Sequence, residues 1–250
     1  MTAATISVDN LPLHNVTSKF LKEKIESAIK THTQITVATI NPEFIVAAHR
    51  NKKFFDTLLQ FDYRVVDGSG IMLMTRLFTK QRFAERVTGS DLSMDLLELA
   101  GRHGYRIMLL GGSPESSAAA NANITKKYPN IVLDCFDGGI INPDAIKPEV
   151  LQRIENFEPD ILLVALGMPK QEYFIKSIGQ KFPVPVMIGV GGTIDFLSGT
   201  IKRAPKVIKA LYLEWLWRLI LQPSRFKRIG QAVFVFPWIY ISGLRRKEKP

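Results

Sequence analysis

The sequence predicts an α/β protein, with a Rossmann-like, mainly parallel sheet that carries helices on both faces and a helical appendage at the C-terminal end. Two observations predict the body: short apolar runs rich in Val, Ile and Leu, and segments of helical spacing between them. A third observation marks the appendage, because the excess positive charge of the chain gathers in its last fifty residues. We therefore divide the chain into an α/β body, 1–200, and a C-terminal appendage, 201–250.

Six apolar runs are the candidate strands, and each has the length of one strand of a parallel sheet. They are Ile35–Ile40, Tyr63–Val66, Arg106–Leu110, Ile131–Cys135, Ile161–Leu166 and Val184–Val190. Ligands of such sheets bind beyond the carboxyl ends of the strands. The loops that follow these runs are therefore the places to look for a site.

Four segments have the apolar spacing and the terminal residues of helices. They begin after Thr17 or Ser18, at Leu92, at Pro114 and near Pro169, and end near Lys30, Gly101, Lys127 and Gln180. Ser, Thr and Asp are favoured as N-caps, so Asp91 and Ser113 are the expected caps of the second and third helices. Pro114 suits the first helical position, where the missing N–H has no partner to lose, and Pro169 is expected to open the fourth helix.

The composition disfavours several classes of protein. Cys135 is the only cysteine, the four histidines are scattered, and no D-x-D pair follows a strand. We therefore expect no disulfide framework, no metal site and no bound cofactor. The N-terminus lacks the basic and apolar regions of a signal peptide. Neither the GxGxxG nor the GxxxxGK[ST] fingerprint is present.

The C-terminal appendage combines positive charge with aromatic residues. It holds twelve of the 33 Lys and Arg but two of the 23 Asp and Glu, and so carries the whole net charge of +10. It also holds all three tryptophans, and its uncharged run Ile229–Leu244 is short for a membrane span and contains Pro237. We expect the appendage to lie on an anionic membrane surface. The alternative is a segment docked on the body with its charges in solvent.

Glycine pairs follow two of the strands and precede helical segments. Gly111–Gly112 and Gly191–Gly192 allow close backbone approach, and exposed amides at helix starts suit phosphate oxygens. For either pair alone, a tight turn without a ligand is at least as good an interpretation. Because both pairs would lie at the same edge of the sheet, together they favour a phosphorylated ligand.

Three further kinds of residue suit chemistry at that edge. Asp67 follows a strand and precedes Gly68, where a carboxylate projecting into a cleft would suit a general base. Asp195 would suit the hydroxyls of a ribose. For each of them, a helix cap or turn is the simpler alternative. If a diphosphate leaves during the reaction, Arg86 and the arginines of the appendage are the cations available to stabilise it.

Six motifs occur in one order along nearly the whole chain. They are T-I-N-P-E at 39–43, V-D-G-S-G at 66–70, R-V-T-G-S-D at 86–91, G-M-P-K-Q-E at 167–172, G-V-G-G-T-I-D-F-L-S-G at 189–199 and R-A-P at 203–205. Each motif is weak by itself, but the ordered set resembles the WecG/TagA/CpsF glycosyltransferases. The resemblance continues into the appendage through Glu214–Trp215, Arg218, Pro223, Arg225 and Arg228.

The resemblance implies an inverting, metal-independent glycosyltransferase of cell-surface polysaccharide synthesis in bacteria. Its donor would be a UDP-sugar, of the UDP-N-acetylmannosamine type or another UDP-hexose. Its acceptor would be a polyprenyl-diphosphate-linked saccharide at the cytoplasmic face of the plasma membrane, where the enzyme would be peripheral. Which donor, acceptor and polysaccharide apply stays open.

The resemblance also implies roles for individual residues. Asp67 would be the general base, Thr39 and Asn41 would position the sugar with Gln171 nearby, and Asp195 would hold the uridine ribose. Arg218, Arg225 and Arg228 would reach the diphosphates.

The chain departs from the family pattern at one loop. An aromatic residue, stacking on the base, would be expected after Gly138, where this chain has Gly139–Ile140. Phe136 is a candidate substitute.

Two other functions compete with this interpretation. The sequence pI of about 9.7 suits a nucleic-acid-binding α/β protein, but a groove for phosphates needs no long uncharged run among its basic residues. A Rossmann-type oxidoreductase is disfavoured by the absent glycine fingerprint. The aromatic face of the appendage also suits a second copy of the chain, so a homo-oligomer is a further expectation, with monomer, dimer and trimer all open.

Overall fold

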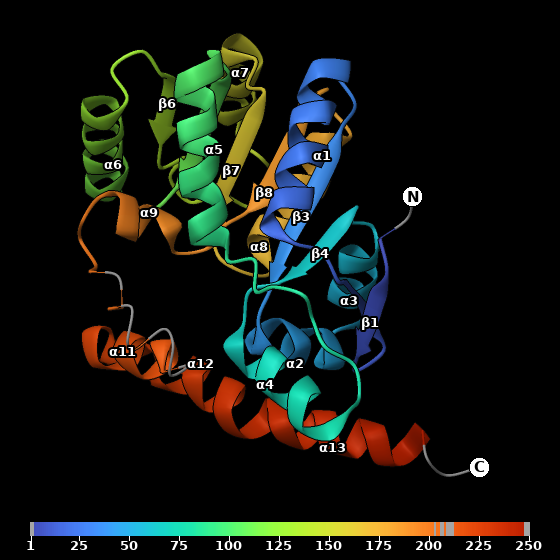
Figure 1. The fold of residues 1–250 in the computed structure, drawn as a ribbon. Coiled ribbons are helices and arrows are strands. Elements are labelled where there is room, and N and C mark those ends of the chain that lie inside the picture. The colour runs from blue at the N-terminus through green and yellow to red at the C-terminus, as the bar shows by residue number, and fades with distance from the viewer. Residues whose placement is uncertain (1–2, 203, 206–207, 209–212, 248–250) are drawn as a thin grey trace.

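The computed structural model describes residues 3–202, 204–205, 208 and 213–247. Arg203 of the R-A-P motif lies outside these residues. Six parallel strands form one sheet in the order β4-β3-β8-β7-β5-β6 (Figure 1). They are β3 (Ile35–Ile40), β4 (Tyr63–Val66), β5 (Arg106–Gly111), β6 (Val132–Phe136), β7 (Ile161–Ala165) and β8 (Val186–Gly189). The predicted parallel α/β sheet is confirmed, with strand ends that differ from the expected ones by at most two residues.

Helices cover both faces of the sheet, because successive side chains of each strand point to opposite sides. In β5, Ile107 and Leu109 join one buried cluster, whereas Met108 and Leu110 join the other. The first cluster includes residues of α1 (Ser18–Thr31), α5 (Gly89–His103) and α6 (Pro114–Lys127). The second includes residues of α2 (Pro42–Arg50), α3 (Lys52–Leu59), α4 (Ser69–Phe78), α7 (Pro148–Phe157) and α8 (Lys170–Gly179). The four central strands are thus buried on both sides, which explains their apolar character, whereas the edge strand β6 is mostly half-buried and includes Asp134.

The helix caps agree with the sequence in two cases and differ in one. Thr17 caps α1 and Ser113 caps α6, as predicted. Asp91 does not cap α5, which begins earlier, because Thr88 accepts the amide of Asp91 and is the cap. The Asp91 carboxylate instead accepts the Thr88 hydroxyl at 2.7 Å from the first turn, where the helix dipole favours negative charge.

A hairpin that the sequence analysis did not identify packs beside the sheet edge. It consists of β1 (Thr5–Val8) and β2 (Leu11–His14), which pair antiparallel through a two-residue turn. Asp9 and Asn10 have φ values of 48° and 65°, as a type I′ hairpin turn requires. Arg64 of β4 fixes the hairpin, since its guanidinium donates to the Pro12 carbonyl at 2.8 Å.

The described part of the C-terminal appendage consists of helices below the sheet (Figure 1), and Gln222 with a 3-10 turn over Pro223–Arg225 separates the first of them from the long helical segment that follows. The appendage runs through α11 (Glu214–Leu221), α12 (Phe226–Gly230) and α13 (Phe236–Lys247), with a π-helical turn over Gln231–Val235. Pro237 has no N–H to donate, which accounts for the irregular turn before it.

One side of this arm packs on the body. Phe236, Ile239 and Tyr240 are buried in the same cluster as α2 and the hairpin, whereas Phe234 and Trp238 are exposed. The alternative of a docked segment therefore holds for one side of Ile229–Leu244. Among the helices of the described residues, none has the length and apolar character needed to cross a bilayer.

Candidate active site

The carboxyl edge of the sheet and the C-terminal appendage enclose a cleft with two adjoining compartments. The polar compartment, about 240 Å³, is lined by loops after β3, β4, β5, β7 and β8. The apolar compartment, about 360 Å³, lies between α4 and the appendage and includes Leu73, Trp215 and Phe236. The residues common to both compartments are Asn41, Glu43, Asp67, Arg218 and Arg225.

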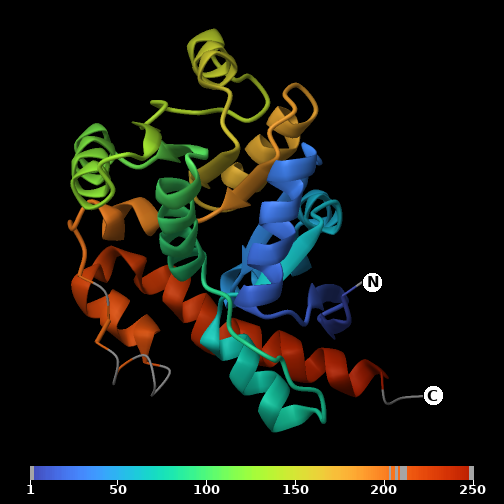
Figure 2. The same ribbon diagram turned by 45° about the horizontal axis from the view of Figure 1, so that its top comes forward.

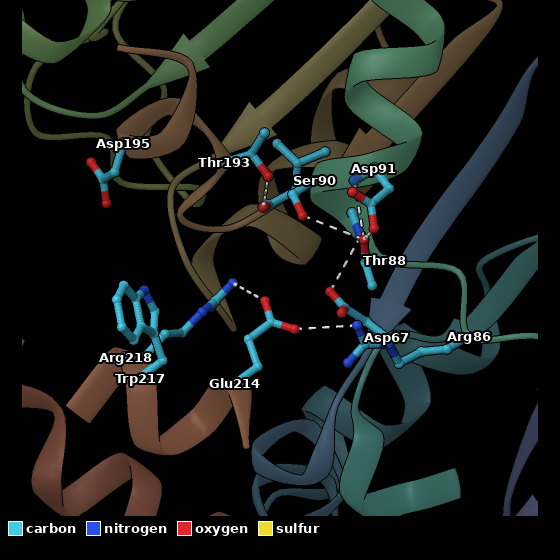
Figure 3. Close-up of polar contacts among 12 residues, drawn as sticks. Asp67, Arg86, Thr88, Ser90, Asp91, Thr193, Asp195, Glu214, Trp217 and Arg218 are labelled. Carbon is cyan, nitrogen blue, oxygen red and sulfur yellow. Dashed lines mark hydrogen bonds and ion pairs between the residues drawn. The ribbon is translucent and has the colours of Figure 1, made fainter. Parts of the chain in front are cut away.

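Asp67 lies where the two compartments meet. Its backbone N–H donates to Ile40 at the end of the neighbouring strand, and its carboxylate accepts the Gly89 amide at 3.3 Å (Figure 3). It does not cap α4, whose N-cap is Gly68. An added Cβ at Gly68 would lie 2.3 Å from Pro42. A glycine there therefore lets α4 start against α2, which brings Asp67 beside Asn41.

Burial raises the pKa of Asp67 to about 6, because the cleft removes water from the carboxylate. Arg218, the Gly89 amide and Arg86 act in the opposite direction, and Glu214 adds to the rise. At neutral pH the group is therefore mainly ionised while remaining basic enough to accept a proton.

Among the residues that the structure describes, four arginines line the cleft, and each is within ion-pair distance of a carboxylate. Glu214 lies between two of them, 3.2 Å from Arg86 and 3.7 Å from Arg218 (Figure 3). Arg225 lies 4.0 Å from Asp195, and Arg228 lies 2.7 Å from Glu43.

The arginines also crowd one another. Burial, followed by the neighbouring Arg228 and Arg218, lowers the pKa of Arg225. The buried Nε of Arg218 has no hydrogen-bond partner among the described residues. Such an arrangement favours an anion with several acceptor oxygens.

Thr39, Asn41 and Gln171 are held by hydrogen bonds at the strand ends. The Thr39 hydroxyl donates to the Gly189 carbonyl at 2.9 Å, and the Asn41 side-chain oxygen accepts the Glu43 amide at 2.9 Å. Asn41 is therefore the N-cap of α2 as well as part of the cleft wall. Gln171 accepts the Gly191 amide at 3.1 Å, which ties α8 to the loop after β8.

Glu172 lies beneath this loop and was not among the residues predicted for the site. One carboxylate oxygen accepts the Gln171 amide at 2.6 Å, while the other has no hydrogen-bond partner among the described residues. Burial raises the pKa of Glu172 to about 8, against the smaller effects of the Gln171 side chain and the Glu172 backbone amide.

The two glycine pairs differ in their surroundings. Gly112, Gly191 and Gly192 line the polar compartment. Gly111 lies outside it, and an added Cβ there would lie 2.5 Å from the Ala165 carbonyl, so this glycine serves strand packing. The loop at Gly191–Gly192 leads into α9 (Thr193–Leu197), a helix of only five residues that carries Asp195.

The start of α6 has fewer free backbone amides for a phosphate than the sequence implied. The Ser113 amide already donates to the Ser116 hydroxyl, and the Ser116 amide to the Ser113 hydroxyl. This capping box occupies two of the amides that could otherwise face a ligand.

Phe136 lies in the hydrophobic core rather than in the cleft. It is 9% exposed, and the Arg153 guanidinium stacks over its ring at 4.5 Å. It lines neither compartment, so Phe136 is not placed to stack on a base.

Within the described ranges, no three His, Cys, Asp or Glu side chains come together as metal ligands. The carboxylates that face the cleft are instead distributed among the arginines. Of these, the sequence analysis missed Glu43 as a site residue and did not assign Glu214 a role. Glu214 had a signal, because it precedes Arg218 by four residues on a predicted helical segment and is one of two acids in the appendage.

Comparison with known proteins places this geometry in context. A family model described as "Glycosyl transferase WecG/TagA/CpsF family" matches residues 6–250. A protein of Bacillus subtilis (strain 168), named N-acetylglucosaminyldiphosphoundecaprenol N-acetyl-beta-D-mannosaminyltransferase, is 35% identical over 227 residues, covering 90% of this chain and 87% of that protein. A protein of the same name from Staphylococcus aureus (strain MRSA252) is 31% identical over 249 residues, covering 98% and 95%.

Proposed function

Since this chain belongs to the WecG/TagA/CpsF family of glycosyltransferases, we propose that it transfers a sugar from a UDP-sugar to a polyprenyl-diphosphate-linked saccharide. The donor would be of the UDP-N-acetylmannosamine type. The names of the relatives describe an N-acetylmannosaminyl group moved to N-acetylglucosaminyl-diphosphoundecaprenol. The observation that carries the proposal is the place of Asp67, at the junction of a polar and an apolar compartment among four arginines.

In the proposed reaction, Asp67 is the general base. The acceptor hydroxyl attacks the anomeric carbon, its proton passes to the Asp67 carboxylate, and the bond from the anomeric carbon to the diphosphate oxygen breaks. A single displacement of this kind inverts the anomeric centre and needs one base rather than a nucleophile. A positioned base contributes about 10²–10⁴-fold to the rate. The pKa of about 6 suits this role at neutral pH.

The departing UDP would be stabilised by the arginines without a metal ion. Arg218 and Arg225 border both compartments, and Arg228 lines the polar one. Guanidinium groups donate in pairs to phosphate oxygens and keep their charge at neutral pH. Arg86, on the opposite side of Glu214, adds a cation from the body.

The two compartments suit the two substrates. Thr39, Gln171 and Asp195 surround the polar compartment, which we assign to the donor sugar and its nucleotide. The apolar compartment is lined by Met74, Val233 and Pro237 among others, and we assign it to the lipid-linked acceptor. With this assignment, donor and acceptor meet at Asp67.

We also propose that the enzyme is peripheral at the cytoplasmic face of the plasma membrane, where a lipid-linked acceptor and a nucleotide sugar are both accessible. The exposed aromatic residues and positive charges of the appendage support this placement. Family membership decides for a glycosyltransferase over the nucleic-acid-binding protein and the oxidoreductase that the sequence also allowed.

The test is substitution of the base. Asp67→Asn should lower UDP release, in the presence of a short-chain lipid-diphosphate-GlcNAc acceptor and UDP-N-acetylmannosamine, by about 10²-fold or more, while UDP binding by calorimetry persists. The matched control is Asp56→Asn, which changes a carboxylate on α3 that lines neither compartment and should keep its activity. Near-normal turnover of Asp67→Asn would remove Asp67 from the base role.

A further inference from the structure

α4 is a helix of the body that connects the proposed base to the outside of the molecule. It begins two residues after Asp67, and Gly68–Gly70 at its start line the apolar compartment. It also contacts α13, and the two helices lie side by side at the same end of the molecule (Figures 1 and 2). The outer side of α4 is therefore next to the C-terminal appendage.

The outer side of α4 exposes large apolar side chains. Leu73 is 45% exposed, Leu77 64% and Phe78 48%. Leu73 and Leu77 lie four residues apart, so they occupy the same side of the helix. A surface helix normally presents polar residues there. Clustered exposed apolar side chains mark a contact surface rather than an ordinary solvated face.

Positive charge surrounds these side chains. Residues 68–84 include Arg76, Lys80 and Arg82 but no Asp or Glu. Arg76 and Arg82 line a hollow of about 300 Å³ together with Leu73 and the apolar Met72 and Phe83. Arg82 is held in place, since its guanidinium donates to the Gln81 carbonyl at 2.8 Å and to the Thr79 carbonyl at 2.5 Å. We call Leu73, Arg76, Leu77, Phe78, Lys80 and Arg82 the α4 face.

The appendage also exposes apolar side chains, next to the α4 face. Phe234 and Trp238 are exposed four residues apart. The residues directly before them, Val233 and Pro237, line the apolar compartment, as Leu73 does from α4. The wall of that compartment therefore joins two helices that both expose apolar side chains.

We propose that the α4 face is a second membrane-contacting surface, which docks on anionic phospholipid alongside the appendage. The sequence analysis had assigned contact with an anionic surface to the appendage alone. Apolar side chains bordered by cations match the acyl chains and phosphates of a lipid surface. Two identical basic faces would repel each other across a two-fold axis, which disfavours a second copy of the chain as the occupant.

Docking of α4 has a consequence for the proposed function. With both helices on the bilayer, the apolar compartment between them would receive a lipid-linked acceptor directly from the membrane. This consequence rests on the proposed function. The membrane contact itself does not, and can be measured without any transfer reaction.

The first test uses the full chain and vesicles of equal parts phosphatidylglycerol and phosphatidylcholine. The double variant Leu77→Ser/Phe78→Ser should lower the vesicle partition coefficient in co-sedimentation by about tenfold or more. Both side chains are exposed, so circular dichroism should stay as in the unmodified protein. The control is Ile140→Ser, which removes an apolar side chain that is 86% exposed after β6, at the sheet edge opposite β4. It should bind vesicles normally.

The second test separates charge from apolar contact. Arg76→Glu/Lys80→Glu should weaken binding to the anionic vesicles by about tenfold or more. The matched control is Lys19→Glu/Lys126→Glu, which makes the same charge change on α1 and α6 and should have a much smaller effect. If both α4 variants partition like the unmodified protein, the α4 face is not a membrane contact. Unchanged partitioning with a lower mass in sedimentation velocity would assign the face to a second copy instead.

A parallel assay keeps this proposal distinct from the proposed function. With a water-soluble acceptor analogue, the α4 variants should release UDP at the rate of the unmodified protein, because Leu77 and Phe78 line neither compartment. If the unmodified protein binds vesicles through α4 but transfers no sugar, the membrane contact stands and the proposed function fails. If transfer is normal and neither α4 variant affects vesicle binding, the proposed function stands and the membrane contact of α4 fails.

Discussion

At the scale of single residues, Asp67 is governed by opposing electrostatic effects. Burial raises its pKa and Arg218 lowers it, while Glu214 raises it further from the other side of the same ion-pair group. The charges that would hold the leaving group therefore also set the pH at which the base becomes available.

This balance predicts opposite pH shifts for two substitutions. If Asp67 is the base, kcat/KM should fall about tenfold per pH unit below about 6, because protonation removes the base. Arg218→Gln removes a cation and should move this acidic limb to higher pH, whereas Glu214→Gln removes an anion and should move it to lower pH. The measurement is kcat/KM for UDP release between pH 4.5 and 8.5, with circular dichroism at each end. If the acidic limbs of the two variants shift in the same direction, or do not shift, Asp67 is not the group that titrates.

Glu172 gives a prediction for stability. Its pKa in the folded state, about 8, lies above the ordinary value of 4.5, so the folded state binds the proton more tightly than the unfolded chain does. The stability from this group is present at low pH and is lost as pH rises through about 8. Glu172→Gln stays neutral, can still accept the Gln171 amide, and should be more stable than the unmodified protein at pH 9 by about 2–4 kcal/mol.

Urea unfolding at pH 5 and pH 9 measures this difference. The difference in free energy of unfolding between Glu172→Gln and the unmodified protein should be smaller at pH 5 than at pH 9. The control Glu155→Gln, at an exposed site on α7, should unfold with nearly the same free energy as the unmodified protein at either pH. A destabilised Glu172→Gln at pH 9 would mean that the buried carboxylate is compensated by a group not yet identified.

At the scale of elements, α13 has a buried and an exposed side, and its residues should respond accordingly. Phe236 is 1% exposed in the core cluster, whereas Trp238 is 68% exposed. Phe236→Ala should therefore lower the free energy of unfolding by about 3–5 kcal/mol, and Trp238→Ala should change it by less than about 0.5 kcal/mol. Chemical denaturation followed by circular dichroism tests both. Equal costs would contradict the packing of α13 on the body.

The same scale shows why some elements could be predicted and others could not. The strands are short apolar runs because both faces of the sheet are covered, and this pattern is local in the sequence. The N-cap of α5 was misplaced because T-G-S-D contains three possible caps, Thr88, Ser90 and Asp91, and the choice among them depends on where the helix first packs. The hairpin had a signal in the Asp9–Asn10 turn, but its strands of four residues are too short to stand out.

At the scale of the whole molecule, the sequence predicted a site at the carboxyl edge of the sheet, where the structure has the cleft. Of the residues it proposed, Gly111 and Phe136 lie outside both compartments. What it could not provide is how the appendage folds back on the body. The pairing of Arg228 with Glu43 joins residues 185 positions apart, and the exposed side of α4 depends on which side α13 covers. Such contacts follow from packing between distant segments, and no local pattern in the sequence predicts them.

The ion pairs of the cleft have a consequence for which molecules it admits. Every arginine there already neighbours a carboxylate, so a ligand with a single negative charge would only exchange one anion for another and gain little. A ligand with several charges on adjacent oxygens can draw two or three guanidinium groups at once. The ion pairs of the cleft thus discriminate by charge, and they favour diphosphates over neutral sugars and singly charged ligands.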